Sequence, residues 1–226
     1  MRRRQLLLQP PLIALFAVVP GARAASESDS AVAIRAALER GAVAAVNLLG
    51  RTDGFLGNPK VRIPLPGALA DAAGMLRGIG MGKRIDELET AMNRAAEAAV
   101  PQARQLLVAT VKALSVEDAV RIVSGGDDAA TQFFAGKTRA PLTERFLPIV
   151  TRATEKVALA AKYNAVAGRA SKMGLLKPQD ADVQRYVTAR ALDGLYLVIG
   201  EEERKIRRDP VGTGSAILRK VFGSLR

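Results

Sequence analysis

Two acidic side chains, Glu97 and Asp193, are the candidates for acid–base chemistry in this sequence. Asp193 interrupts the apolar run 191–199, so we expect it to face other helices, and Glu97 lies among small alanines. Burial of a carboxylate raises its pKa or requires a partner group. The two could serve as general acid and general base of a hydrolase if their environments separate the two pKa values. The alternative is structural, and we favour it: each carboxylate pairs with an arginine or caps a backbone and fixes the register of its helix.

A polar group accompanies Glu97 on the same predicted helix. Asn93 and Glu97 are four residues apart and share a helical face, and Arg94 lies one step round from Asn93. Because the neighbouring alanines let another helix approach closely, we expect this group to meet Asp193 or Glu201 in a buried cluster. Such a cluster is either a carboxylate pair for hydrolysis or a polar network between helices. We favour the network, because nothing in the sequence fixes a separation between the carboxylates.

The residue types that the chain lacks exclude several kinds of catalytic and metal-binding site. It contains no cysteine and no histidine, which excludes disulfides, Cys or His metal sites, Ser-His-Asp triads, Cys-His dyads and histidine pH switches. The acidic residues Asp127, Asp128 and 201–203 do not have the spacing of a calcium loop, and no cofactor motif is found. The sequence therefore predicts no metal site and no cofactor, and it favours binding over catalysis.

A second set of candidates lies on residues 53–66, which we call the strap. Turn signals (Asp-Gly, Gly-Asn-Pro) and the alternating prolines of 63–66 predict an irregular, proline-stiffened extended segment. Its apolar side chains must either pack across the protein's own helices or be offered to a partner or an apolar ligand, for example as a lid over a pocket. The candidate binding residues are therefore Phe55, Ile63 and Leu65 of the strap, with Asn93, Arg94, Glu97, Asp193 and Glu201.

Helices must position these residues. The chain has 226 residues, of which 49% are hydrophobic and 25% charged, and no alternating run demands a sheet. We predict an all-α fold: a single compact, bundle-like domain over residues 25–226, with the strap as its one irregular segment rich in proline and glycine. The helix expected over about 182–208 should be surrounded by others, because its centre, 191–200, is apolar nearly all round.

Several helix boundaries follow from capping and breaking residues. Asp29 or Ser30 can cap a first helix that ends near Leu49, and Asp127 or Asp128 can cap a later one. A break is expected at 78–82. Pro141 is expected to begin a separate helix.

Residues 1–24 have the pattern of a secretory signal peptide. Arginines 2–4 precede the apolar stretch 12–19, and Ala22-Arg23-Ala24 fits a cleavage site. The apolar stretch is too short to span a membrane, which requires about 20 residues, although an uncleaved interfacial anchor is an alternative. We predict a periplasmic protein cleaved after Ala24, exported by either the general or the twin-arginine route. Without cysteine it cannot be a lipoprotein.

The chain is basic, with a formal net charge of +12. Cleavage would remove arginines 2–4 and Arg23 but no acid, which leaves +8. A basic exported surface attracts anionic lipid or acidic polymers. The short basic and apolar segment 217–222 suits peripheral contact with an anionic membrane, or packing onto the bundle. Nucleic acid is disfavoured, because no dense Lys/Arg block with interleaved aromatics is present.

Short motifs occur in a recognisable order along the chain: Asp53-Gly54-Phe55, Asn58-Pro59, 63–66, 92–97, 127–131, 147–150, 191–195 and 201–203. In this order, over about residues 31–223, they resemble the bacterial family of unknown function DUF4197. The resemblance implies a helical, exported protein of the Gram-negative cell envelope, and it implies no activity, substrate or catalytic residue. Some relatives look like lipoproteins, from which this chain departs by lacking the cysteine.

The function predicted from these observations is that of a non-enzymatic periplasmic binding protein. Its partner would be an apolar ligand, a lipid or another envelope protein, contacted near the strap. The two alternatives are an envelope hydrolase that uses Glu97 and Asp193, and a purely structural or assembly protein.

Overall fold

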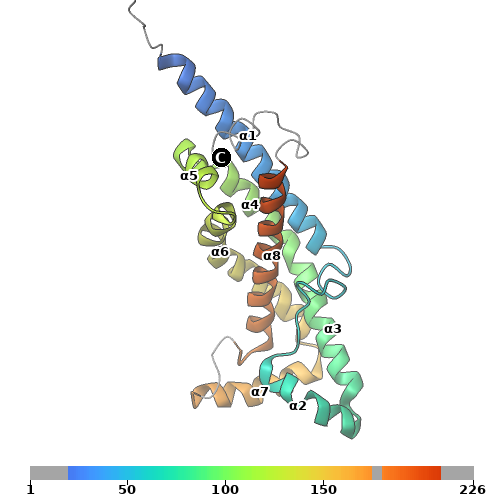
Figure 1. Cartoon of the computed structure of the whole chain (residues 1–226). Helices are drawn as coiled ribbons and strands as arrows, with labels where there is room; N and C mark the ends of the chain where they lie inside the picture. The colour runs from blue at the N-terminus through green and yellow to red at the C-terminus, as the bar shows by residue number, and fades with distance from the viewer. Residues whose placement is uncertain (1–19, 175–179, 210–226) are drawn as a thin grey trace, which may run out of the picture.

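The computed structural model describes residues 20–174 and 180–209, and within them all regular structure is helical (Figure 1). The predicted all-α fold is confirmed. In chain order the described helices are α1 (Pro20–Leu49), α2 (Gly67–Leu76), α3 (Gly82–Ala99), α4 (Ala103–Lys112), α5 (Val116–Ser124), α6 (Ala129–Thr154), α7 (Ala158–Lys172) and α8 (Val183–Arg208). Short helical turns, Arg77–Met81 and Val100–Gln102, join α2 to α3 and α3 to α4.

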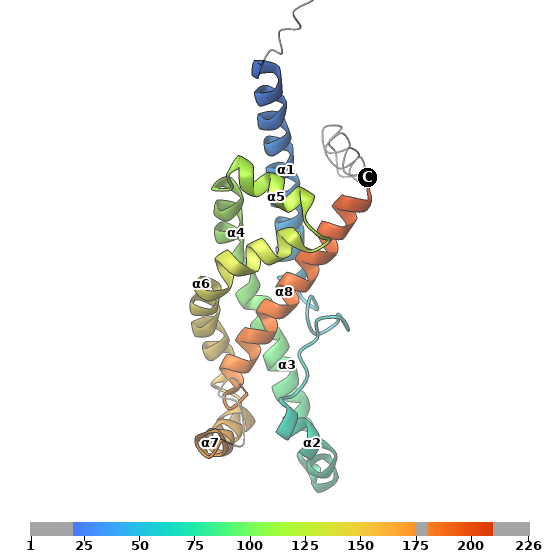
Figure 2. The same ribbon diagram turned by 60° about the vertical axis from the view of Figure 1, so that its left-hand side comes forward.

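The helix α8 runs through the middle of the fold and packs against α6, α1 and α3 (Figures 1 and 2). Most of its circumference is buried, as its apolar centre predicts. In the central part of the helix, the exception is a narrow stripe of Arg190, Asp193 and Leu197, which are exposed. Spacings of three and four place these residues on one face of the helix, so Asp193 points to solvent.

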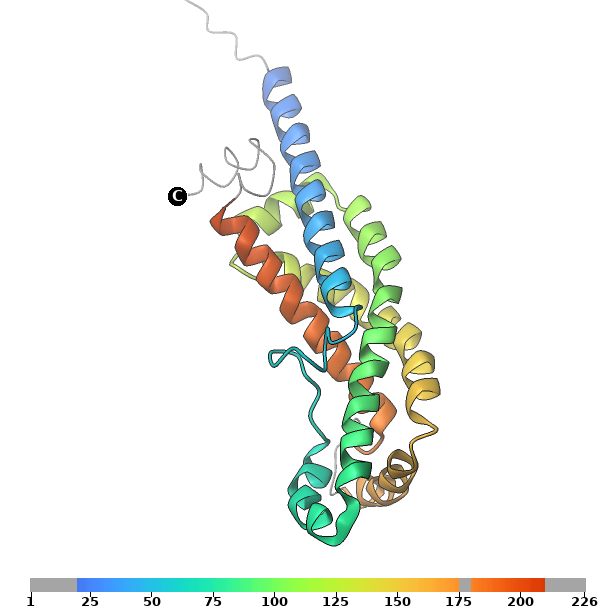
Figure 3. The ribbon, with the colours of Figure 1, turned by 90° about the vertical axis from the view of Figure 1, so that its right-hand side faces the viewer.

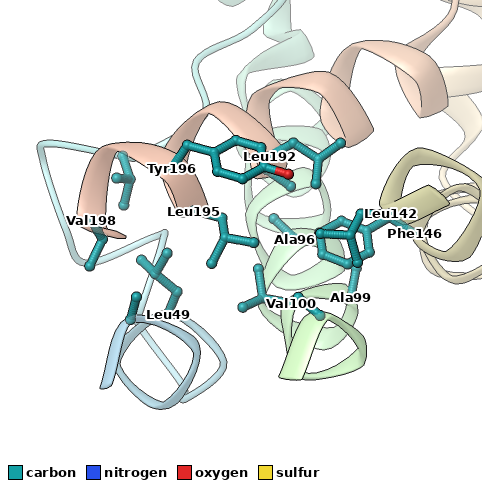
Figure 4. Close-up of a cluster of buried hydrophobic side chains, with 14 of the residues drawn as sticks. Leu49, Ala96, Ala99, Val100, Leu142, Phe146, Leu192, Leu195, Tyr196 and Val198 are labelled. Atoms are coloured by element: carbon teal, nitrogen blue, oxygen red, sulfur yellow. The ribbon is translucent and has the colours of Figure 1, made fainter. Parts of the chain in front are cut away.

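The core lies between α8, α3 and α6, with the end of α1 against it (Figure 4). Leu195 of α8, Val100 after α3 and Phe146 of α6 are fully buried, and Leu49 reaches the cluster from α1. Burial of a side chain of this size contributes about 1.5–3 kcal/mol. This apolar cluster fixes α3 and α8 relative to each other, and the strap lies against both.

The start of α1 differs from the sequence prediction. Asp29 and Ser30 do not cap it, because within the described residues the helix begins at Pro20 and both residues lie inside it. Proline is tolerated in the first turn, where its missing N–H has no partner in any case, and the residues after it include good helix formers. The predicted end is confirmed, since α1 stops at Leu49, directly before Gly50.

The helix α6 is also longer than predicted. Pro141 does not begin a separate helix: α6 is continuous from Ala129 to Thr154 and contains both Pro141 and Pro148. Proline removes one helix hydrogen bond and crowds the preceding turn, which bends a helix without necessarily ending it. The helix is bent in Figure 2. Phe134 and Leu142, on either side of Pro141, are both buried, and this packing keeps the two halves in one element.

A hairpin of α2 and α3 forms one end of the molecule. The break predicted at 78–82 is confirmed, because the chain reverses at Ile79 and Gly80. Gly80 has φ +83°, a left-handed conformation that glycine adopts without steric cost. The helix α7 contacts α3 and lies at the same end as α2 in all three views (Figures 1, 2 and 3). We call residues 67–84 and 158–173 together the α2–α7 end.

Candidate functional site

The strap packs on the protein's own helices. Phe55 and Ile63 are 0% and 1% exposed, and Leu65 is buried as well. Of the two alternatives for these side chains, burial against the bundle is the one observed. Gly194 of α8 makes room for the strap, since a Cβ atom at this position would lie 2.8 Å from Cε1 of Phe55 and 3.2 Å from Cβ of Val61. The role of the strap residues in binding stays a prediction that requires the strap to move.

Glu97 of α3 holds the first half of the strap. Its Oε1 atom accepts hydrogen bonds from the backbone N–H groups of Phe55 (3.0 Å) and Leu56 (3.1 Å). Its Oε2 atom accepts one from Nη1 of Arg94 at 2.7 Å. The carboxylate is buried, and it replaces the backbone acceptors that this irregular segment lacks. Charge assistance makes such hydrogen bonds stronger than neutral ones.

Arg94 connects Glu97 to the start of the strap. Its Nη2 atom donates to Oδ1 of Asp53 at 2.8 Å. Asp53 has φ +63°, a left-handed conformation that aspartate tolerates better than most residues. The hydrogen bond to Glu97 is the largest cause that raises the pKa of Arg94 above its ordinary value. The arginine therefore stays charged and spans the two acids.

Asn93 holds the second half of the strap. Its Oδ1 atom accepts from the backbone N–H of Ile63 at 2.8 Å, and its Nδ2 donates to the carbonyl oxygens of Ile63 (2.9 Å) and Glu89 (2.8 Å). The side chain is 0% exposed. Its amide thus pairs with both polar groups of one strap residue, as a neighbouring strand would. From α8, the Tyr186 hydroxyl donates to the Pro64 carbonyl at 3.2 Å.

Two ion pairs lie along the exposed edge of the strap. Lys60 pairs with Glu201 of α8 at 2.7 Å, and Arg62 pairs with Glu89 of α3 at 3.0 Å. Pairs of this exposure contribute little to stability individually. We refer to Asn93, Arg94 and Glu97 with their strap contacts as the latch.

The buried cluster of Asn93 and Glu97 with Asp193 or Glu201 is therefore not formed. The polar residues of α3 bind the strap instead, and Glu201 lies at the strap's rim. Asp193 is 50% exposed and pairs with Arg139 of α6 at 2.9 Å, with Arg190 at 3.9 Å. The expectation that Asp193 faces other helices is wrong, because residue 193 falls on the exposed stripe of α8. Its pairing with arginine is the structural alternative that the sequence favoured.

No described hydrogen bond or ion pair joins the two carboxylates. Glu97 is bound to two N–H groups and an arginine, and Asp193 is bound to other arginines at the surface. A general acid and base must both reach one substrate bond. The described contacts place each of them in a separate structural role.

Glu203 is a buried acid whose role was not predicted from the sequence. It accepts hydrogen bonds from the N–H groups of Ala130 and Thr131, both at 2.9 Å, and pairs with Arg207 at 2.9 Å. It therefore caps α6 from α8, and the expected cap by Asp127 or Asp128 is wrong, since Asp128 makes no side-chain cap. The spacing of the sequence indicates that Glu203 is buried, because residue 203 follows Leu195 and Ile199 at intervals of four on the buried face of α8.

Half of the large exposed apolar side chains lie at the α2–α7 end, and they are the most exposed ones. Of the eight large hydrophobic side chains that are exposed in the described residues, four belong to this end: Met75, Ile79, Val166 and Met173, each 68–70% exposed. The others are Val32 of α1, Val116 and Val120 of α5, and Leu197 of α8. In the part of the chain that the structure describes, no helix is long and apolar enough to cross a membrane. The same residues contain no group of three or more acidic side chains that could hold a metal ion.

The fold and the latch define an all-α protein in which buried polar side chains lock an irregular strap onto α3 and α8. The family model described as protein of unknown function (DUF4197) matches residues 24–223. The chain belongs to this family, and the resemblance found from the motifs is confirmed, with a match that begins before residue 31. No curated protein and no solved structure matches this chain.

Proposed function

We propose that this chain is a non-enzymatic binding protein of the cell envelope, which contacts an apolar partner or lipid through the α2–α7 end. One observation carries the proposal: Met75, Ile79, Val166 and Met173 expose apolar surface together at this end. Exposed apolar side chains that gather in one region of a molecule mark sites of contact with proteins, membranes or ligands. The strap is not the contact surface in this proposal, because its apolar side chains are buried.

The uses found for the candidate carboxylates support binding over hydrolysis. Glu97 belongs to the latch, and Asp193 forms surface ion pairs. The proposed location in the cell envelope rests on the signal-peptide pattern of residues 1–24, of which 1–19 lie outside the described residues. N-terminal sequencing of the protein isolated from its host tests that address, and Ala25 is the expected first residue.

The binding proposal is tested by placing a photo-crosslinking amino acid at position 79 in the full chain, expressed in its own host cells. The matched control places it at position 120, where Val120 is also exposed but belongs to α5. Adducts with lipid or with an envelope protein are expected at position 79 and not at position 120. An equal yield at both positions would count against the α2–α7 end as the contact surface.

The competing hydrolase is tested separately. Glu97→Gln and Asp193→Asn should leave binding unchanged in protein that folds. If the chain hydrolyses an envelope substrate, and both substitutions abolish that hydrolysis without unfolding the protein, the non-enzymatic proposal is wrong.

A further inference from the structure

We infer that the partner of the α2–α7 end is an anionic phospholipid surface, into which the apolar side chains of this end insert. The inference rests on the proposed function and deepens it, because it names the partner's chemistry. It is carried by the charges that surround the exposed apolar side chains, by their arrangement on α7, and by the shape of the hairpin.

The exposed face of α7 combines apolar and basic side chains and no acid. Lys162, Val166, Arg169 and Met173 follow one another at spacings of four, three and four and are all exposed, so they share one face. The opposite face carries the buried side chains of Ala160 and Ala167. No acidic residue occurs between 158 and 172, and Lys172 adds a third cation. This is the side-chain combination of helices that lie in the interface of an anionic bilayer.

The hairpin of α2 and α3 carries further exposed apolar side chains at the same end of the molecule. Met75 and Ile79 are exposed at and beside the turn. Apart from chain neighbours and the local helix backbone, no atom lies within 4 Å of where a Cβ atom would be at Gly74, Gly78 or Gly80. The tip is therefore uncovered by the rest of the described chain. Lys83 and Arg84 follow directly after the tip and are exposed.

The cations of this end are available to an external anion. Arg77 is already paired with Asp86 at 2.7 Å. Among the described residues, no acid lies within ion-pair distance of the remaining five: Lys83, Arg84, Lys162, Arg169 and Lys172. Unpaired cations around apolar side chains complement a surface that offers negative headgroups above hydrocarbon.

A lipid surface suits this end better than a protein partner does. The apolar side chains come from two separate elements, a turn and the face of a helix, rather than from one continuous groove or flat face. A fluid bilayer accommodates such separate projections without a matching shape, whereas a protein interface requires complementary packing at its core.

Tryptophan fluorescence locates the inserted end, because the chain contains no tryptophan. Ile79→Trp and the matched control Val120→Trp are prepared in the full chain, so residues 1–24 contribute equally to both. With vesicles of phosphatidylglycerol and phosphatidylethanolamine, the emission of Ile79→Trp should shift to the blue and be quenched by brominated lipid. Val120→Trp should change in neither respect, and vesicles of phosphatidylcholine alone should bind much more weakly.

The charge contribution is measured by vesicle flotation with a matched pair of triple variants. Lys162→Gln, Arg169→Gln and Lys172→Gln together remove three cations from α7. Arg40→Gln, Arg104→Gln and Lys112→Gln together remove three exposed cations from α1 and α4. The first triple variant should bind about a hundred-fold less than the unmodified chain, and the second should lose much less. Circular dichroism verifies that both remain folded. Raising the salt concentration should weaken the binding of the unmodified chain.

Three outcomes distinguish the lipid inference from the proposed binding function. The lipid inference fails if Ile79→Trp shows no shift with anionic vesicles, or if both triple variants lose binding equally, because attraction would then be general. If vesicles do not bind but position 79 still cross-links to an envelope protein in cells, the lipid inference is wrong and the binding function stands. If neither vesicle binding nor a cross-link specific to position 79 occurs, the proposed function fails as well.

Discussion

Glu97 and Asn93 supply the hydrogen-bond partners that an irregular backbone cannot find in itself. The N–H groups of Phe55, Leu56 and Ile63 lie in neither a helix nor a sheet, and all three donate to side chains of α3. A buried N–H group without an acceptor costs about 1–3 kcal/mol. These two α3 side chains therefore decide whether the strap can lie on the core.

Two substitutions of Glu97 distinguish what its negative charge contributes to stability from what its hydrogen-bond acceptors contribute. Glu97→Gln keeps an oxygen for the two strap N–H groups and loses the pairing with Arg94, so we expect a loss of about 1 kcal/mol in the free energy of unfolding. Glu97→Leu leaves both N–H groups unsatisfied and should cost about 3 kcal/mol. Urea denaturation measures both. Glu144→Gln, which changes an exposed residue, serves as the control, and its expected change in the free energy of unfolding is below about 0.5 kcal/mol. A Glu97→Leu variant as stable as this control would contradict the role of Glu97 in the latch.

The sequence indicated part of this site and could not indicate the rest. The shared face of Asn93 and Glu97 follows from a spacing of four, which is a local property of a helix. Their strap partners are 30 and 41 or 42 positions away, and no periodicity encodes such a distance. Asp193 was misplaced because Leu197, an apolar residue, shares its exposed stripe and conceals the polar side of α8.

At the scale of elements, the strap and α8 fit each other through a missing side chain. Gly194 lies where the ring of Phe55 meets the helix, and the strap closes only because no Cβ atom stands there. The strap's existence could be predicted from its turn residues and prolines. The place on α8 where the strap packs could not be predicted, because a glycine within an apolar helical run does not indicate which segment packs against it.

A pair of glycine substitutions tests this contact. Gly194→Ala places a methyl group 2.8 Å from Phe55, so overpacking should exceed the gain in helix propensity and destabilise the protein by about 1–3 kcal/mol. Gly136→Ala is the control, because Gly136 lies within α6 and, apart from chain neighbours and the local helix backbone, no atom lies within 4 Å of its Cβ position. This substitution should stabilise the protein by about 0.5–1 kcal/mol. Thermal unfolding compares the two, and a Gly194→Ala protein as stable as Gly136→Ala would contradict the tight contact.

At the scale of the whole molecule, the buried core and the most exposed apolar side chains lie in different parts of the described chain. The latch and the core lie along α3, α6 and α8, whereas the four most exposed of the large apolar side chains lie at the α2–α7 end. The sequence predicted the all-α class and the family. It did not predict this separation, because α2 and α7 are far apart in the chain and only the tertiary fold brings them to one end. An apolar, glycine-rich stretch such as 74–82 indicates a turn without showing what lies beside it.

The tyrosines report on this packing as a whole. The chain has three, Tyr163, Tyr186 and Tyr196, and all are buried. Burial is the largest cause that raises the pKa of each phenol above the ordinary value of 10.0, because it disfavours the phenolate. Hydrogen bonding to Thr138 opposes this effect at Tyr196. No exposed tyrosine is present to obscure their titration.

An alkaline titration should therefore show less phenolate at pH 10 in folded protein than in unfolded protein, in urea, which is about half ionised there. Above pH 10 the unfolded state releases these protons first, so the folded state binds more protons and the free energy of unfolding falls as pH rises. Stability from the buried phenols is thus fully present below pH 10 and is lost as pH rises through the folded pKa values. Absorbance at 295 nm follows ionisation, and urea unfolding at pH 9 and 11 follows stability. Half ionisation of the folded protein at pH 10 would mean that water reaches the phenols and that the helices pack more loosely than described.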